Sequence, residues 1–238
     1  MKQNLILFFA LLFSFSAYGQ EFQFQAVGNL AELGGQVKIQ IPPEDISRVK
    51  GEVLDERGKP IANANIVLCG ETMFFADKSN KKGDYSVGGR YGNYTIVAFA
   101  AGYKKQSVEV ELGRGRVSTL NFKLEPIAQA KSTSNKGDII RAGFGSYTIV
   151  YDAKNPAYAS QSLYDKLCNL PCVELSDDIY VSGERNVSLY LNNKEARVPM
   201  QSFVKMLKSI EAQQVTAIKV MKGNKFQNLA PSIFVSYK

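Results

Sequence analysis

Histidine, the side chain that most often acts as a general acid or base, is absent from this chain. Its absence from all 238 residues removes the Ser-His-Asp and Cys-His nucleophile arrangements and the common zinc sites. Carboxylate pairs occur at Asp55/Glu56 and Asp177/Asp178, but both lie in segments of turn composition, where solvated acidic residues are common. No glycine-rich segment has the strand-to-helix context of a phosphate-binding loop. The sequence therefore predicts a protein that is not an enzyme and has no catalytic, cofactor-binding or metal-binding residues.

Three cysteines, Cys69, Cys168 and Cys172, carry the remaining reactive chemistry. An oxidising compartment permits disulfides, and an odd number leaves at least one thiol unpaired or bonded to another chain. Cys168 and Cys172 flank the end of a predicted helix, where four residues separate Cα atoms by about 6 Å, near the upper limit for bridging. Cys168–Cys172 is therefore the candidate disulfide, and buried, reduced thiols are the alternative.

The elements that would position these residues are clearest between Val49 and Leu124. Turn signals rich in Gly, Asp and Asn punctuate this stretch at short intervals, and apolar residues alternate between them. Period-2 runs separated by such turns are typical of strands with one buried face, packed as a sandwich. The alternating runs are Ile66/Leu68, Tyr85/Val87, Tyr94/Ile96/Ala98, Val108/Val110/Leu112 and Leu120/Phe122/Leu124.

The same stretch resembles the carboxypeptidase regulatory-like domain. The resemblance covers residues 48–125 and implies a small all-β sandwich of seven strands, Ig/prealbumin-like, that is an accessory module in secreted or outer-membrane proteins. It implies no peptidase activity, because the sandwich is not the catalytic part of those proteins. The matching residues are Gly51, Val53, Asp55, Gly58, Pro60, Ile61, Ala64, Ile66, Asp77, Gly83, Tyr85, Tyr94, Gly102 and Tyr103.

The amino terminus has the pattern of an export signal. Residues 1–19 contain one charge, an apolar run from Leu5 to about Phe15, and small residues before Gln20, which predicts a signal peptide cleaved before Gln20. An uncleaved membrane anchor is the weaker alternative, because the run falls short of the ~20 residues that span a bilayer. We therefore expect an exported protein, periplasmic or associated with the outer membrane, whose mature chain does not span the membrane.

Residues 20–47 form a lead-in segment in which Gln36–Ile41 alternates like one strand.

The formal net charge of the chain is +7, but its basic residues are scattered, and nucleic-acid binding needs a clustered patch or a reading motif. We therefore expect no nucleic-acid partner.

A polar, aperiodic stretch at residues 126–137 predicts a linker to a second domain at 138–238. This second part alternates strands and helices, which predicts an α+β fold. The expected elements are a strand at Ser146–Tyr151, a helix at Ser160–Leu170 with Ser160 as N-cap, a hairpin of Asp178–Val181 with Val187–Leu191, a turn at Asn192-Asn193, a helix at Met200–Ile210, and strands at Val215–Met221 and Ile233–Tyr237.

The order of these elements resembles the plug domain of TonB-dependent outer-membrane receptors, of the Bacteroidetes type that carries a sandwich in front. The resemblance rests on the order and spacing of the matching residues together, which are Leu163, Leu167, Leu170-Pro171-Cys172-Val173, Ile179, Val181, Gly183, Val187, Leu189, Leu191-Asn192-Asn193, Val215, Ile218 and Val220-Met221. Cys172 and Asn193 stand where the family has Gly, and Thr216 and Lys219 replace its two acidic residues. The 22-stranded barrel of such receptors would need strands of about ten residues each, which do not follow.

These observations favour a non-catalytic cell-envelope protein that acts as a binding or scaffolding module. The alternative is a separated or truncated component of a transport receptor whose barrel is encoded elsewhere. Without a barrel wall, a plug-like domain must cover its surface differently, and the partner we expect is another envelope or outer-membrane protein. The candidate contact residues, on the expected hairpin and second helix, are Tyr190, Arg197, Lys205 and Lys208.

Overall fold

The computed structural model describes residues 21–23, 38–40, 46–127, 138–176, 178–196, 200–224 and 228–238. The expected signal peptide and most of the expected linker lie outside the described residues. Within the lead-in segment, β1 (Glu21–Gln23) and β2 (Lys38–Gln40) pair antiparallel. The strand expected at Gln36–Ile41 is thus present at its centre, and its partner is β1 rather than the sandwich.

The first sheet of the sandwich is built around the long strand β3 (Ile46–Asp55). β6 (Asp84–Arg90) pairs with it antiparallel on one side. On the other side β9 (Val117–Thr119) and β10 (Phe122–Leu124) pair with it parallel. Inward residues of these strands, including Val49, Val53 and Tyr85, pack in the sandwich core as the alternation predicts.

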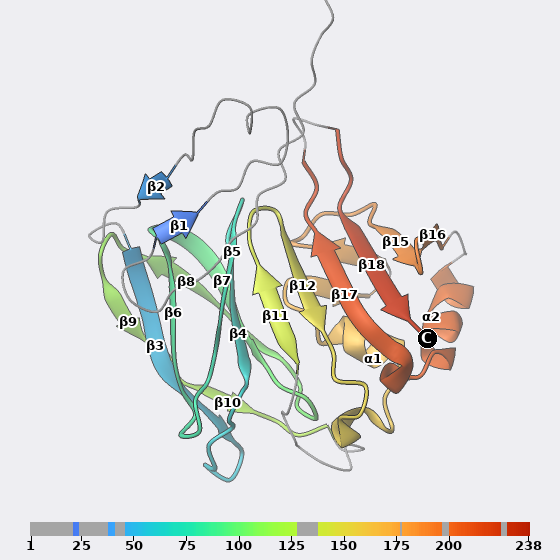
Figure 1. Cartoon of the computed structure of the whole chain (residues 1–238), viewed down its shortest axis with the longest axis horizontal. Helices are drawn as coiled ribbons and strands as arrows, with labels where there is room; N and C mark the ends of the chain where they lie inside the picture. Colours follow the sequence, from blue (N-terminus) through green and yellow to red (C-terminus); the bar gives the residue numbers. More distant parts are fainter. Residues whose placement is uncertain are drawn as a thin grey trace, which may run out of the picture.

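The second sheet has the order β5-β4-β7-β8. Its strands are β4 (Asn65–Cys69), β5 (Phe74–Lys78), β7 (Gly92–Phe99) and β8 (Gln106–Leu112). All pairs in this sheet are antiparallel. In Figure 1 the two sheets face one another as the blue-green half of the molecule. The all-β sandwich predicted from the sequence is confirmed.

Eight strands stand where seven were expected, because the last strand is interrupted. Leu120 and Asn121 separate β9 from β10, and the carbonyl of Leu120 turns toward Gly51 on β3. A Cβ at Gly51 would stand 1.8 Å from that oxygen. Only glycine allows this approach, and the hydroxyl of Tyr85 then donates to the same oxygen at 2.7 Å.

The described residues of the second half combine a six-stranded sheet, order β11-β12-β17-β18-β15-β16, with a separate pair β13–β14 and two α-helices. The strands are β11 (Ile139–Ala142), β12 (Ser146–Val150), β13 (Val173–Leu175), β14 (Ile179–Val181), β15 (Ser188–Leu191), β16 (Lys194–Glu195), β17 (Val215–Met221) and β18 (Ser232–Tyr237). The helices are α1 (Leu163–Cys168), α2 (Met200–Ser209) and the 3₁₀ turns η3 (Pro156–Tyr158) and η4 (Ala212–Gln214).

Most of the elements expected in this half are present, but the expected hairpin is wrong. β14 pairs with β13, whereas β15 pairs with β18 and β16. The N-cap of α1 is Ser162 rather than Ser160, because Ser162 and Asp165 form a reciprocal capping box. Asn192 and Asn193 turn the chain between β15 and β16 at positive φ, as expected.

One apolar core joins the two halves. Every residue of β4 is buried: Ile66 and Leu68 face the sandwich core, whereas Val67 and Cys69 face the second half. Phe74 on β5 packs edge-on against Tyr147 on β12, with ring centroids 5.1 Å apart. Figure 1 shows β4 and β5 lying next to the β11–β12 pair. The halves therefore pack as three successive sheets, rather than as two domains that touch only through a linker.

Candidate functional site

A disulfide crosses the interface where the sandwich packs against the second half, which we call the joint. Cys69, the last residue of β4, is bonded to Cys172, which lies in the turn after α1. Their Cα atoms are 6.7 Å apart, and 103 residues separate them in sequence. The predicted Cys168–Cys172 bridge is therefore wrong. The helical spacing of Cys168 and Cys172 permits a bridge, but packing of the sandwich brings Cys69 to Cys172 instead.

Cys168 is left as a half-buried free thiol at the end of α1. Burial raises the pKa of its thiol, and the hydrogen bond with Tyr164 acts against that effect. A thiol with a raised pKa is a weak nucleophile at neutral pH, because the thiolate is the reactive form. The environment of Cys168 is that of a structural cysteine.

Lys105, which follows the sandwich strand β7, holds the carboxyl end of α1. Its Nζ donates to the carbonyl oxygens of Leu170 at 2.8 Å and Val173 at 2.6 Å. Carbonyls after a helix have no partner within the helix, and a cation is favourable there. The side chain of Asn169 donates to the carbonyl of Tyr103 and accepts from the backbone of Lys105. The sandwich thereby anchors the C-cap residue Asn169 and the segment that follows α1.

Two further lysines cross the joint. Lys222, after β17, donates to the carbonyl of Gly70 in the sandwich, and Lys78 on β5 donates to the carbonyl of Asp138 in the second half. Burial lowers the pKa of both amines, against the attraction of nearby carboxylates. The backbone N–H of Phe74 also donates to the carbonyl oxygen of Gly143 at 2.9 Å, which continues the contact along β5. Polar contacts therefore reach from each half into the backbone of the other.

A buried amine lies at one end of this joint. Lys166, on α1, is only 3% exposed. Its Nζ lies 3.4 Å from the ring centroid of Tyr151 and 3.2 Å from that of Tyr158. Within the described residues this Nζ has no hydrogen-bond partner. Burial lowers the pKa of Lys166 to about 7, against the attraction of the Asp138 carboxylate.

Asp138 is the buried acid of the same cluster. Its carboxyl accepts from the Tyr158 hydroxyl and, at 3.0 Å, from the backbone of Asp152. Burial raises its pKa, whereas these hydrogen bonds and the amines of Lys166 and Lys78 lower it. We name Lys166, Asp138, Tyr151 and Tyr158 the amine cluster. The sequence did not predict this cluster, because a lysine that stands between the leucines of a helix is usually exposed to solvent.

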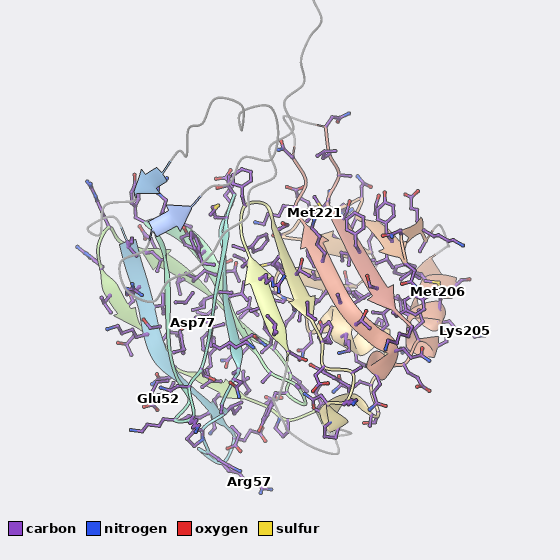
Figure 2. The ribbon with its side chains drawn as sticks, viewed as in Figure 1. Glu52, Arg57, Asp77, Lys205, Met206 and Met221 are labelled. Carbon is purple, nitrogen blue, oxygen red and sulfur yellow. A yellow bond between two sulfur atoms is a disulfide. The ribbon has the colours of Figure 1, made fainter. Side chains whose placement is uncertain are left out.

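The candidate contact residues do not share one surface. Lys205 and Lys208 are exposed on α2, which packs through Phe203 and Leu207 against the inner face of the six-stranded sheet. Tyr190 alternates with the inward Leu189 and so points from the opposite face. Figure 2 shows Lys205 at the end of the molecule away from the sandwich. Arg197 lies outside the described residues, and whether any of the four touches a partner stays a prediction.

The outer face of the six-stranded sheet carries an aromatic pair. The rings of Tyr190 and Phe234 stack on neighbouring strands, with centroids 4.7 Å apart and planes 8° from parallel. At the other end of the face, the cross-strand neighbours Ile139 and Val150 are 48% and 38% exposed. This face therefore presents apolar side chains at both ends.

No group of three or more metal-ligating side chains occurs in the part of the chain that the structure describes. Within that same part, no helix is both long and apolar enough to cross a membrane.

The two carboxylate pairs that the sequence offered are Asp55/Glu56 and Asp177/Asp178. The side chain of Asp55 accepts hydrogen bonds from the backbone N–H groups of Arg57 and Lys59, as is typical of a turn residue. Asp177 lies outside the described residues.

Comparison with known families identifies the sandwich. The carboxypeptidase regulatory-like domain family matches residues 48–125, which confirms the resemblance drawn from the turn and strand residues. The match ends before the second half, whose resemblance to a receptor plug stays a prediction. No curated protein matches the sequence.

Solved structures show distant likeness. The minor pilin GBS52 of Streptococcus agalactiae is 14% identical, with 42% of this chain and 52% of that one covered and a TM-score of 0.31. A DUF3823 family protein from Parabacteroides merdae is 13% identical over 45% of this chain and 58% of that one, TM-score 0.30. The Bacillus anthracis TIE protein is 13% identical, with 74% of this chain and 44% of that one covered and a TM-score of 0.32. The chain thus spans about half the length of these structures.

Proposed function

We propose that this chain is an exported, non-catalytic binding or scaffolding module of the cell envelope. The observation that carries the proposal is the Cys69–Cys172 disulfide, which fastens the sandwich to the second half. Disulfides of this structural kind persist in oxidising compartments and are rare in the cytosol. The bond therefore supports export independently of the apolar segment at residues 1–19.

The joint also supports a scaffolding role. A disulfide, a shared apolar core and lysine contacts from both sides hold the halves in one orientation. Domains within a chain move relative to one another by default unless their interface is large and apolar, and here a covalent bond adds to the apolar packing. A module built in this way presents its outer surfaces at fixed positions relative to one another, which suits a protein that positions a partner.

The outer face of the six-stranded sheet is the contact surface that we propose for that partner. Aromatic side chains such as Tyr190 and Phe234 are enriched at protein interfaces, because they offer a large apolar area with few rotatable bonds. The partner would be another envelope or outer-membrane protein. The order of strands and helices in residues 138–238 supports descent of this half from a receptor plug, with transport as the alternative role.

The first experiment tests export and the disulfide together. The full chain is expressed in a bacterial host with its own amino terminus, and the cells are fractionated. We expect an envelope fraction that begins at Gln20 and yields a Cys69–Cys172 peptide pair without reductant. A cytosolic product that retains Met1 and reduced thiols would contradict the proposal.

The second experiment tests the contact face. A photo-crosslinking amino acid replaces Tyr190 in one variant, Lys205 in a second, and Tyr91, an exposed sandwich residue, in a third. We expect one discrete adduct with an envelope protein from position 190 and none from position 91. An adduct from position 205 alone would move the contact to α2, and no adduct from either position would sink the binding role.

A further inference from the structure

We propose that the amine cluster makes the joint between the halves respond to pH: protonation of Lys166 opens the packing of residues 155–168 against the sandwich. The proposal starts from geometry. An ammonium group offers three donors, yet the Nζ of Lys166 lies between two tyrosine rings without a hydrogen-bond acceptor among the described residues. A buried charge without hydrogen bonds is costly, and aromatic faces offset only part of that cost.

The cluster lies where the halves meet. Tyr158 packs with Ala157 and Ala212 of the second half and with Ala101 of the sandwich. Asp138, which accepts from the Tyr158 hydroxyl, is also bonded through its carbonyl to Lys78 on β5. The rings of Tyr151 and Tyr158 lie against the Lys166 amine, with centroids 3.4 and 3.2 Å from its Nζ. In the opening that we propose, Tyr158 moves away from this amine, and because Tyr158 belongs to the same packed cluster as Ala101 of the sandwich, the joint loosens with it.

The charged groups around the amine set the direction of the response. Asp138 is the carboxylate that favours the ammonium form of Lys166. This carboxylate also accepts hydrogen bonds from Tyr158 and from the backbone of Asp152, and it attracts the amine of Lys78. The hydroxyls of Tyr151 and Tyr158 stay protonated in this range, because burial raises the pKa of both well above 10.0. Lys166 is therefore the group whose titration near pH 7 drives the response.

The sign follows from proton linkage. In the closed protein the pKa of Lys166 is about 7, against 10.5 for an exposed lysine. Between these values the opened form binds a proton that the closed form lacks, so opening becomes easier as pH falls through this window and levels off below about 7. With these two values, the opened population at pH 6 is about tenfold that at pH 8.

The experiment uses the full oxidised chain. Lysine side chains carrying ¹³C at the ε-methylene are titrated by NMR from pH 5.5 to 10. Hydrogen exchange of peptides from residues 155–168 is measured at pH 6 and pH 8 and corrected for intrinsic exchange rates. Two variants are compared: Lys166→Met keeps an unbranched side chain, one atom shorter and without the amine, and Lys205→Met is the matched change on exposed α2.

We expect one lysine signal with a midpoint near 7 that is absent from Lys166→Met, and a loss of protection of about tenfold from pH 8 to pH 6 in the native protein and in Lys205→Met. Lys166→Met should show equal protection at both pH values. The proposal is overturned if every lysine titrates above pH 9, or if protection of residues 155–168 in the native chain is the same at both pH values. These two readouts need no variant, so they decide the matter even if Lys166→Met fails to fold.

Discussion

Cys69 and Cys172 are bonded across the joint, so that the end of sandwich strand β4 is fixed to the turn after α1. The two residues lie in different sequence halves, yet both belong to the packing between β4 and the second half. The bond therefore closes a loop of 103 residues around a shared core rather than pinning a surface turn.

Removal of this bond should destabilise the whole chain. A disulfide that closes a loop of about 100 residues contributes roughly 5 kcal/mol by restricting the unfolded chain. We expect Cys69→Ser/Cys172→Ser to lose about that much unfolding free energy in urea, and Cys168→Ser to lose less than about 1 kcal/mol. Equal losses in the two variants would mean that the bond is not the one described.

The sequence could not have revealed this pairing. Helical spacing made Cys168 and Cys172 look like partners, since local geometry is all that spacing reports. Cys69 is brought to Cys172 only because Val67 and Phe74, beside it on the same face, are covered by the second half. A face covered by a distant part of the chain leaves no local signature.

Other elements were predictable to the extent that their information is local. Alternation located most sandwich strands, and helical periodicity located α2 to within a residue. β5 was missed because its five residues, FFADK, show no alternation of apolar and polar side chains. The expected hairpin failed because turn residues suggest where a chain reverses, but not which strands pair; β15 pairs with β18, about forty residues later. Lys166 was missed for the same reason as the disulfide.

Gly51 should tolerate no side chain. A Cβ there would stand 1.8 Å from the Leu120 oxygen and 2.6 Å from its carbonyl carbon, both backbone atoms. We expect Gly51→Ala to cost about 3 kcal/mol, because β9 and β10 must move away from β3. In Gly88→Ala, on neighbouring β6, the nearest atom to the new Cβ is 3.5 Å away. Chemical denaturation of that control should match the native chain, and a Gly51→Ala curve that does so too would refute the close approach.

Phe74 should stabilise both halves at once. Its ring is buried against Tyr147 across the joint, and truncation of a buried Phe to Ala typically costs about 3–5 kcal/mol. We expect Phe74→Ala to lower the stability of the sandwich and of the second half together, in a single transition followed by circular dichroism and tyrosine fluorescence. Phe144→Ala, at a 56% exposed ring nearby, should cost less than about 1 kcal/mol. Two separate transitions in the native chain would instead favour independent domains.

Lys105 should matter far more than its neighbour Lys104. Loss of the Nζ contacts in Lys105→Met leaves the carbonyls of Leu170 and Val173 without this donor, which should cost about 2–4 kcal/mol in urea denaturation. Lys104 is exposed and pairs with Glu125 at the surface, so Lys104→Met should leave the unfolding midpoint unchanged.

The loss in Lys105→Met should also depend on pH. Burial lowers the pKa of Lys105 from 10.5, against the influence of Cys168 and Glu174. The folded chain therefore releases this proton at a lower pH than the unfolded chain, so the Lys105 amine costs stability as pH falls below 10.5. Methionine carries no such cost. The unfolding free energy of the native chain should therefore exceed that of Lys105→Met by more at pH 10 than at pH 7. Urea denaturation of both chains at the two pH values measures this difference, and a gap that widens toward pH 7 would show that the amine is more strongly protonated in the folded chain than in the unfolded one.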